Sequence, residues 1–219
     1  MQALISFCKR YPYACLLAAQ LLSVLFYGFL GDSHINHLLI NCVGLAVPIL
    51  AVWVVYRSPA VNWIGFVLAA PAILLTLLAE FAGINLLQSL AHTFESLLYF
   101  YAAISLVMRM FDDDIVTLDE LYMAAATFTL LVWGFALVYS VCQQIYPQSI
   151  TAASNPQAAR SWMELLFMSF SVQSGTGMGD IMPISNQARV ISIFQMFTGV
   201  MYIAIVVSRL VGLALIPKK

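Results

Sequence analysis

Long apolar stretches separated by short polar connections make up most of this 219-residue chain. A helix that crosses a bilayer needs about 20 mostly apolar residues. Six stretches fit that requirement, at residues 12–30, 38–56, 63–81, 86–108, 118–145 and 188–215. The pattern therefore predicts an all-α membrane protein with six transmembrane helices in a lipid bilayer.

The basic residues are spread unevenly over the connections between these stretches. If both termini are cytoplasmic, two of the nine Lys and Arg residues, Arg160 and Arg189, lie outside. The cytoplasmic ones are then Lys9, Arg10, Arg57, Arg109, Arg209, Lys218 and Lys219. Because this arrangement satisfies the positive-inside rule, we expect a multi-pass protein of the cell membrane with both termini in the cytoplasm. The short chain hints at a prokaryotic inner membrane.

Composition and charge exclude several classes of protein. Only 9% of the residues are charged and 63% are hydrophobic, whereas about 25% of a soluble domain is charged. The net charge of -1, without a basic patch, argues against nucleic-acid binding. We expect neither a metal site nor a disulfide framework from the scattered cysteines Cys8, Cys15, Cys42 and Cys142. We also expect no enzyme and no organic cofactor, since no nucleophile stands with a base or a metal-ligand set.

The connection at residues 146–187 is too apolar in its middle for an ordinary loop. Ser161 and Glu164 have the spacing of a capping box, which predicts a short helix over residues 161–173. The C-terminal end of that helix, near Gln173, carries a partial negative charge that favours a cation. A glycine-rich segment and a second helix follow, so the layout is that of a re-entrant loop. Such backbone survives at membrane depth only where it is buried in protein or lines a water-filled path.

Glycines alternate with other residues directly after this short helix, at Gly175, Gly177 and Gly179, with Thr176 and Met178 between them. Glycine permits backbone torsions that let successive carbonyls point the same way. Four such segments around one axis stack rings of oxygens that replace the hydration shell of an ion. One chain supplies one segment, so the sequence predicts a four-fold homotetramer.

The run S-F-S-V-Q-S-G-T-G-M-G-D-I-M-P, residues 169–183, resembles the pore helix and selectivity filter of potassium channels, whose signature is T-V-G-Y-G-D. Residues 199–212 are similar to the inner helix of bacterial channels of that superfamily. The likeness covers residues 118–215, and the earlier stretches share only the layout of six-span channels. It implies a peripheral four-helix bundle over 1–111 and a pore domain over 112–219, with outer helix 118–145, pore helix 161–173, filter 175–179 and inner helix 188–215.

The filter departs from the family signature at two positions that matter for ion selectivity. Gly175 stands where the family has a threonine whose hydroxyl completes the innermost ion site. Met178 stands where the family has a tyrosine that hydrogen-bonds behind the filter, a bond that methionine cannot make. Thr176 replaces valine, so its hydroxyl needs a partner behind the filter. The resemblance implies passive conduction of K⁺ held by residues 175–179, with Asp180 at the outer mouth, and leaves selectivity over Na⁺ open.

Gly199 lies midway along the last apolar stretch, where glycine lets a helix bend or a neighbour approach closely. The resemblance makes it a candidate gating hinge, and close packing is the other interpretation. The fourth stretch holds no basic residue at the three-residue spacing of a voltage sensor, and Arg109 stands only at its edge. The first four stretches therefore look like a voltage sensor in layout without its gating charges.

His92 and Glu95 lie three residues apart on one face of the fourth stretch. Ionisable groups inside a membrane are functional candidates, here as a pH-sensitive pair or a proton relay. The other interpretation pairs Glu95, ionised or protonated, with His92, Asn41 or a serine. An acidic cluster, Asp112, Asp113, Asp114, Asp119 and Glu120, reads as a solvated linker or a divalent-cation site, with Thr117 and Glu120 spaced as a second capping box.

Two other functions compete with a channel. The altered filter fits a non-conducting or regulatory membrane subunit derived from a channel, which would give no ion flux. A proton-coupled transporter using His92 and Glu95 would show an internal repeat with broken helices in both halves, and the sequence shows no such repeat.

Overall fold

The computed structural model describes residues 10–29, 46–56, 62–112 and 117–214, and the statements below refer to these residues. Part of the predicted span 38–56 lies outside the described residues. So do several residues named above: Cys8, Lys9, Asn41, Cys42, Arg57, Asp113, Asp114, Lys218 and Lys219.

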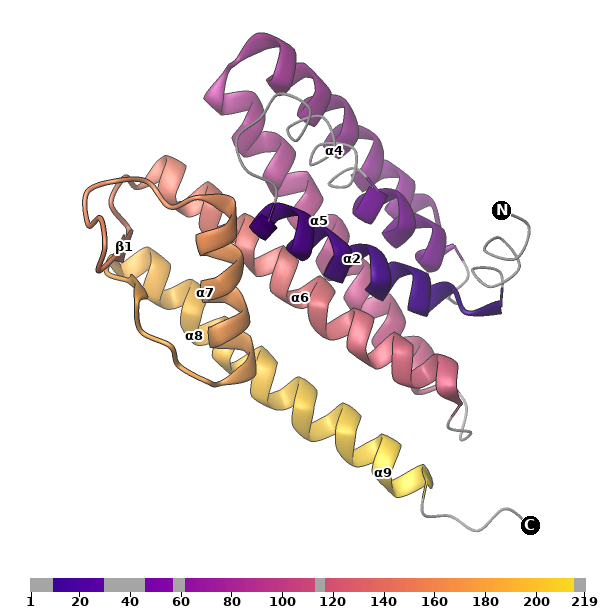
Figure 1. The fold of residues 1–219 in the computed structure, drawn as a ribbon. Helices are drawn as coiled ribbons and strands as arrows, with labels where there is room; N and C mark the ends of the chain where they lie inside the picture. The colour runs from indigo at the N-terminus through magenta and orange to yellow at the C-terminus, as the bar shows by residue number, and fades with distance from the viewer. Residues whose placement is uncertain (1–9, 30–45, 57–61, 113–116, 215–219) are drawn as a thin grey trace, which may run out of the picture.

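The described chain is helical over most of its length, as the apolar pattern predicts (Figure 1). The elements in chain order are α2 (Pro12–Phe29), a helical segment Ala46–Val55, α4 (Asn62–Ala82), α5 (Asn85–Met110), α6 (Leu118–Ile145), β1 (Ile150–Ala152), α7 (Trp162–Ser174), β2 (Ile181–Pro183), α8 (Asn186–Tyr202), the π-helical η1 (Ile203–Val207) and α9 (Ser208–Ala214). Within the described residues, four helices are long and apolar enough to cross a membrane: α2, α5, α6 and the continuous run Asn186–Gly212. The segments Ala46–Val55 and Trp63–Ala79 are apolar but shorter.

Side-chain caps fix where α6, α7 and α8 begin, and the cap of α7 is described with the candidate site below. The Thr117 hydroxyl accepts from the Glu120 amide at 3.3 Å, and the Thr117 amide donates to the Glu120 carboxylate at 3.0 Å. This confirms the capping box at the start of α6 and gives the buried Glu120 of the acidic cluster a structural role. Ser185 caps α8 by accepting from the Ala188 amide at 3.1 Å.

The first helices pack directly against the C-terminal half of the chain. Helix α5 lies between α4 and α6, and α2 packs on α6 and reaches α7 (Figure 1). Buried side chains from both halves form one core, among them Tyr99, Leu130, Leu166 and Val206. The predicted boundary between residues 111 and 112 falls in the connection between α5 and α6, and no gap in the core marks it.

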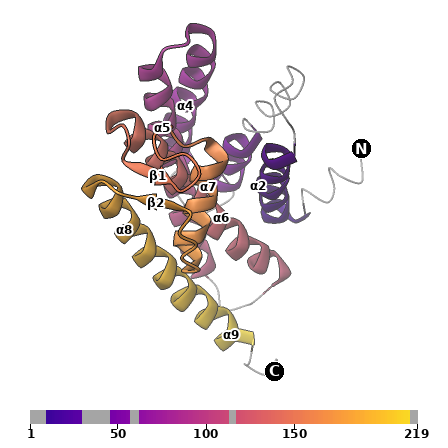
Figure 2. The ribbon, with the colours of Figure 1, turned by 60° about the vertical axis from the view of Figure 1, so that its left-hand side comes forward.

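Helix α7 is short and packs against both α6 and α8, while β1 and β2 lie at one end of this group (Figure 2). The two strands pair antiparallel, with Ile150 opposite Pro183 and Ala152 opposite Ile181. The Ala153 amide also donates to the carbonyl of Asp180 at 3.0 Å. This small sheet is an addition to the predicted all-α fold, and it ties the segment after α6 to the exit of the glycine-rich loop.

One cysteine expectation is wrong. Cys15 in α2 is disulfide-bonded, although the scattered cysteines imply no disulfide framework. Spacing along the chain could not show this, because bonding depends on which cysteines the fold brings within reach. Cys142 in α6 is free and buried.

Candidate functional site

The start of α7 is anchored to the end of α6. The Ser161 hydroxyl accepts from the Glu164 amide at 3.3 Å, and the Glu164 carboxylate accepts from the Ser161 amide at 2.7 Å, which confirms the predicted capping box. Glu164 also forms an ion pair with Arg160 at 3.0 Å. The Gln143 side chain brackets the Arg160 backbone, accepting from its amide and donating to its carbonyl at 2.9 Å each. These bonds fix the point from which α7 points toward the glycine-rich loop.

The end of α7 passes straight into that loop. Gly175 is the C-cap of α7, with φ of 72°, and Gly177 follows with φ of 68°. Both values lie in the left-handed region, which residues with a side chain rarely adopt. The backbone conformation therefore explains why these two positions are glycine. Gly179 does not have a positive φ. The left-handed conformation therefore accounts for two of the three alternating glycines and not for the third.

Ser171, one turn before the end of α7, holds the loop from behind. Its hydroxyl accepts from the Met178 amide at 2.7 Å. Its carbonyl accepts from the Thr176 hydroxyl at 3.3 Å, and Ser174 approaches the same hydroxyl at 2.9 Å. The Thr176 side chain therefore has the partner that the sequence requires of it. Sequence reasoning did not identify Ser171, although serines recur near the end of the predicted short helix, at positions 169, 171 and 174.

Replacing Ser171 with alanine is expected to speed hydrogen exchange of the Met178 amide by about 2- to 12-fold. A backbone amide that loses its acceptor loses about 0.5–1.5 kcal/mol of protection, and more where water replaces the bond poorly. Exchange followed by mass spectrometry on the full chain measures this. Ser174→Ala is the matched control, because its hydroxyl contacts Thr176 and not the Met178 amide. Equal exchange of the Met178 amide in the two variants would show that the Ser171 hydroxyl does not hold the loop.

A buried polar network joins α7 to both long helices beside it. Gln195 in α8 donates to the carbonyl and the hydroxyl of Ser169 in α7, at 3.0 and 2.7 Å. Its side-chain oxygen accepts from the Tyr139 hydroxyl of α6 at 2.9 Å. The Ser169 hydroxyl in turn donates to the Val132 carbonyl at 2.7 Å. Because every member is bonded, the network sets the position of α7 relative to α6 and α8.

Gly199 faces the backbone at the end of α7. A Cβ built on Gly199 would overlap the carbonyl oxygen of Gln173 and stand 3.0 Å from its carbonyl carbon. The structure therefore supports close packing as a reason for this glycine, and the hinge stays a prediction. The side-chain amide of Gln173 is buried here, and neither its nitrogen nor its oxygen has a partner among the described residues.

The inner helix changes its hydrogen-bonding pattern a few residues after Gly199, where η1 has the wider turn of a π-helix. Such segments often occur at functional sites in helices. The helix is held to its neighbours on either side of η1: the Tyr202 hydroxyl donates to the Ala124 carbonyl at 2.5 Å, and the Arg209 guanidinium lies 5.0 Å from the centre of the Phe111 ring.

His92 and Glu95 line one cavity, as their spacing predicts, but they have separate partners. His92 lies 3.1 Å from the Ser140 hydroxyl. Glu95 accepts from the Tyr99 hydroxyl at 2.6 Å. Among the described residues no hydrogen bond joins His92 to Glu95, and the partner that the structure gives this carboxyl group is Tyr99, which the sequence did not suggest; the expected partner Asn41 lies outside the described residues.

Comparison with known proteins bears on the same part of the chain. A family model described as "Ion channel" matches residues 127–214. This match indicates an ion channel. It covers most of α6, all of α7, the glycine-rich loop and the inner helix, which is the region where the sequence resembles potassium channels. No curated protein and no solved structure matches the chain. The ion-channel match supports a membrane location and suggests a protein that is not an enzyme.

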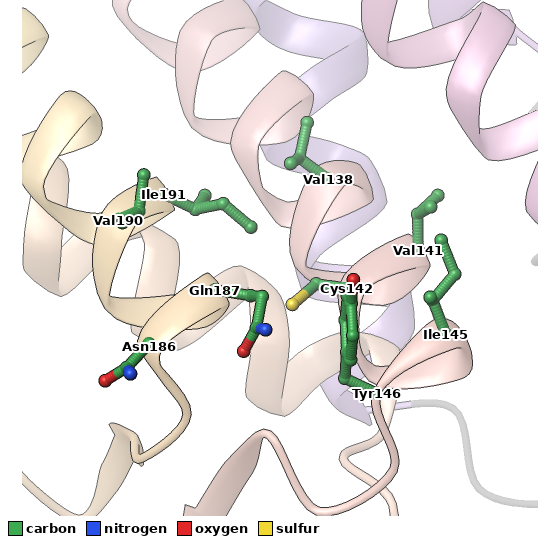
Figure 3. A pocket seen from close by; sticks show the side chains of 9 residues that line it. All are labelled: Val138, Val141, Cys142, Ile145, Tyr146, Asn186, Gln187, Val190 and Ile191. Carbon is green, nitrogen blue, oxygen red and sulfur yellow. The ribbon is translucent and has the colours of Figure 1, made fainter.

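A crevice between α6 and α8 is a second feature of this ion-channel region, with a volume of about 490 Å³ (Figure 3). Cys142 of α6 and Gln187 of α8 point into the gap between the two helices (Figure 3). The lining is otherwise mostly aliphatic, with Val138, Val141 and Ile191 among its members. An ion that leaves water needs oxygen ligands in its place, so this crevice does not suit an ion path.

Proposed function

We propose that the chain is one subunit of a homotetrameric channel that conducts monovalent cations passively, with K⁺ as its main permeant ion. Its six apolar helices cross the cell membrane with both termini in the cytoplasm. Four copies of residues 175–179 form the filter, and Asp180 stands at its outer mouth. The first four helices form a peripheral bundle without gating charges.

One observation carries this proposal: two left-handed glycines, Gly175 and Gly177, directly continue a capped, anchored helix, and Ser171 holds their loop from behind. The C-terminal end of α7 brings a partial negative charge to the start of this loop, which favours a cation there. The loop residues 174–180 are exposed in the single chain. Backbone of this kind inside a membrane requires a water-filled path or surrounding protein, and four copies provide both.

The inner helix supports assembly. Ile193, Phe194 and Phe197 of α8 are 63%, 63% and 64% exposed in the single chain. An apolar face of this size on one subunit is typical of a contact with lipid or with another subunit. A central axis beside α8 would place the four loops around one path, with neighbouring subunits covering part of this face.

The selectivity of this filter follows from its two departures. Gly175 contributes no hydroxyl, so one ring of side-chain oxygens is missing at the inner end. Met178 is 59% exposed and cannot donate a hydrogen bond. The Thr176 hydroxyl is bonded within the subunit. We expect K⁺ to pass, with weaker discrimination against Na⁺ than a T-V-G-Y-G filter gives.

Flux through purified protein in liposomes, under opposing K⁺ and Na⁺ gradients, tests the proposal. The native chain should carry a K⁺ flux that Gly177→Ala abolishes, since a Cβ at positive φ costs about 1–2 kcal/mol and reorients the loop. Gly83→Ala is the matched control, because Gly83 also has a positive φ, of 64°, and lies in the turn between α4 and α5. Its flux should persist.

A double variant assigns the selectivity. Gly175→Thr with Met178→Tyr restores the family signature at both departures, so the ratio of K⁺ to Na⁺ flux should rise severalfold. An absence of flux from folded tetramers under any gradient would contradict a channel open at rest and favour the non-conducting subunit. Flux that is insensitive to Gly177→Ala would place the ion path elsewhere.

A further inference from the structure

A large cavity lies between the first helices and the start of α7, and its described lining includes no residue of the glycine-rich loop. Its volume is about 810 Å³, and its wall is formed by α2, the segment Ala46–Val55, α4, α5, α6, the residues that lead into α7 and the first turn of α7. Ala159, Arg160 and Trp162 line it, so it lies at the same end of the helices as the start of α7. The proposed ion path does not use this cavity.

Glu95 brings an acidic side chain to the cavity. It is the only carboxylate among the lining residues that the structure describes. Arg160 also lines the cavity, but its guanidinium is bonded to the Ala158 and Asn155 carbonyls and to Glu164. One oxygen of Glu95 accepts from Tyr99 at 2.6 Å, and no described residue donates to the other or forms an ion pair with it. The second oxygen is therefore available to a ligand with positive charge.

Three aromatic residues line the same cavity as this carboxyl group. Tyr27, Trp133 and Trp162 line the cavity together with Glu95. The rings of Trp133 and Trp162 meet edge to face with centres 5.6 Å apart, and Tyr27 lies 6.3 Å from Trp162. Tyr99, which holds Glu95, lies 6.3 Å from Trp133. Aromatic faces beside one carboxylate are the means by which proteins bind organic ammonium groups.

Two of the aromatic residues in the cavity wall carry hydrogen-bond donors that have no acceptor among the described residues. The indole N–H groups of Trp133 and Trp162 are buried, and neither has a partner among the described residues. Buried donors are normally satisfied, so an unpaired pair beside a cavity points to a ligand that carries an oxygen acceptor. A hard metal ion fits less well, because it takes several oxygen ligands, and no cluster of three metal-ligating residues occurs in the described ranges.

We propose that this cavity is a binding site for a small organic ammonium ion that carries a hydroxyl or carbonyl oxygen. Glu95 and the faces of Tyr27, Trp133 and Trp162 bind the positive charge. The free indole N–H groups bind the oxygen. Because Trp162 is the first residue of α7, a ligand here contacts the pore helix without entering the pore.

Choline is a suitable probe, because it carries both a quaternary ammonium and a hydroxyl. Calorimetric titration of the full chain in detergent should show saturable choline binding. The uncharged isostere, in which a quaternary carbon replaces the nitrogen, should bind at least about tenfold more weakly, because it lacks the charge. Choline binding no tighter than that of the isostere, or no choline binding by the folded chain, would overturn the proposal.

Matched variants locate the site. Glu95→Gln should weaken choline binding at least about tenfold, while Asp112→Asn, an exposed carboxylate beyond the far end of α5, should not. Trp162→Leu should weaken it as well, while Trp63→Leu, which alters a 64% exposed ring outside the cavity, should not. Gel filtration and circular dichroism check that each variant folds. If Glu95→Gln does not fold, the comparison of Trp162→Leu with Trp63→Leu still tests the proposal. Loss of binding with Asp180→Asn but with neither cavity variant would move the site to the filter mouth and overturn the proposal.

Discussion

Gly199→Ala is expected to destabilise the folded chain by about 3 kcal/mol and to abolish cation flux, whereas Gly212→Ala should do neither. The new methyl group at position 199 overlaps the Gln173 carbonyl, which is backbone and cannot rotate away. Overpacking of this kind costs about 1–3 kcal/mol, and the rigid neighbour favours the upper end. Relief requires α8 to move away from the end of α7, which displaces the loop that begins at Gly175.

Gly212 is the matched control because it lies in the same inner helix and a Cβ there meets nothing within 4 Å in the single chain. Alanine at an exposed helical glycine usually stabilises by up to about 1 kcal/mol. Denaturant unfolding in detergent measures both variants, and liposome flux measures conduction. The same experiment separates the two interpretations of Gly199. A gating hinge alone would leave the stability of Gly199→Ala unchanged and alter only the flux.

The parts of the fold that the sequence predicts well are those with a local physical signal. Apolar stretches long enough to cross a bilayer predict the helices, since every backbone group must be bonded inside the membrane. The pairs Thr117 with Glu120 and Ser161 with Glu164 predict helix starts, because a capping box needs only residues three positions apart. The left-handed φ at Gly175 and Gly177 agrees with the glycine spacing for the same local reason.

Contacts between distant residues have no such signal. Strands β1 and β2 are three residues each, too short for an alternating pattern, and their pairing joins residues on either side of α7. Tyr139 and Gln195 look like packing residues in apolar stretches until the fold brings them to within 2.9 Å. Glu95 shows the same limit: helix periodicity places it on the face of His92, but the bond goes to Tyr99, and the indoles that line the same cavity come from α6 and α7.

The prediction of an ion channel from the sequence depends partly on a local signal and partly on contacts between distant residues. The glycine motif is short, and its meaning depends on the capped helix before it and the apolar helices on either side. The match over residues 127–214 begins within α6 and ends at α9, so it covers that context together with the motif. Residues before the match, among them Tyr13 and Leu16 of α2, belong to the same core as residues inside it, so the first helices are packed as part of one structure with the matched region.

Gln195→Leu is expected to destabilise the chain by about 3 kcal/mol, because it removes three buried hydrogen bonds worth about 1 kcal/mol each and leaves the Ser169 groups without this partner. Gln187→Leu is the matched control. That glutamine is exposed at the start of the same helix, so its loss should change the stability by no more than about 0.5 kcal/mol. Denaturant unfolding of the folded protein in detergent compares the two.

Combining Gln195→Leu with Tyr139→Phe tests whether these residues act as one network. Tyr139→Phe alone should cost about 1–2 kcal/mol, since the hydroxyl bonds both Gln195 and Ser192 at 2.9 Å. The double variant should cost about 1 kcal/mol less than the sum of the single variants, because the bond between the two side chains is counted in each. Strict additivity would show that α6 and α8 hold α7 independently. A coupling of the expected size would show that the three helices are positioned together, with the conformation of the glycine-rich loop depending on a hydrogen bond between α6 and α8.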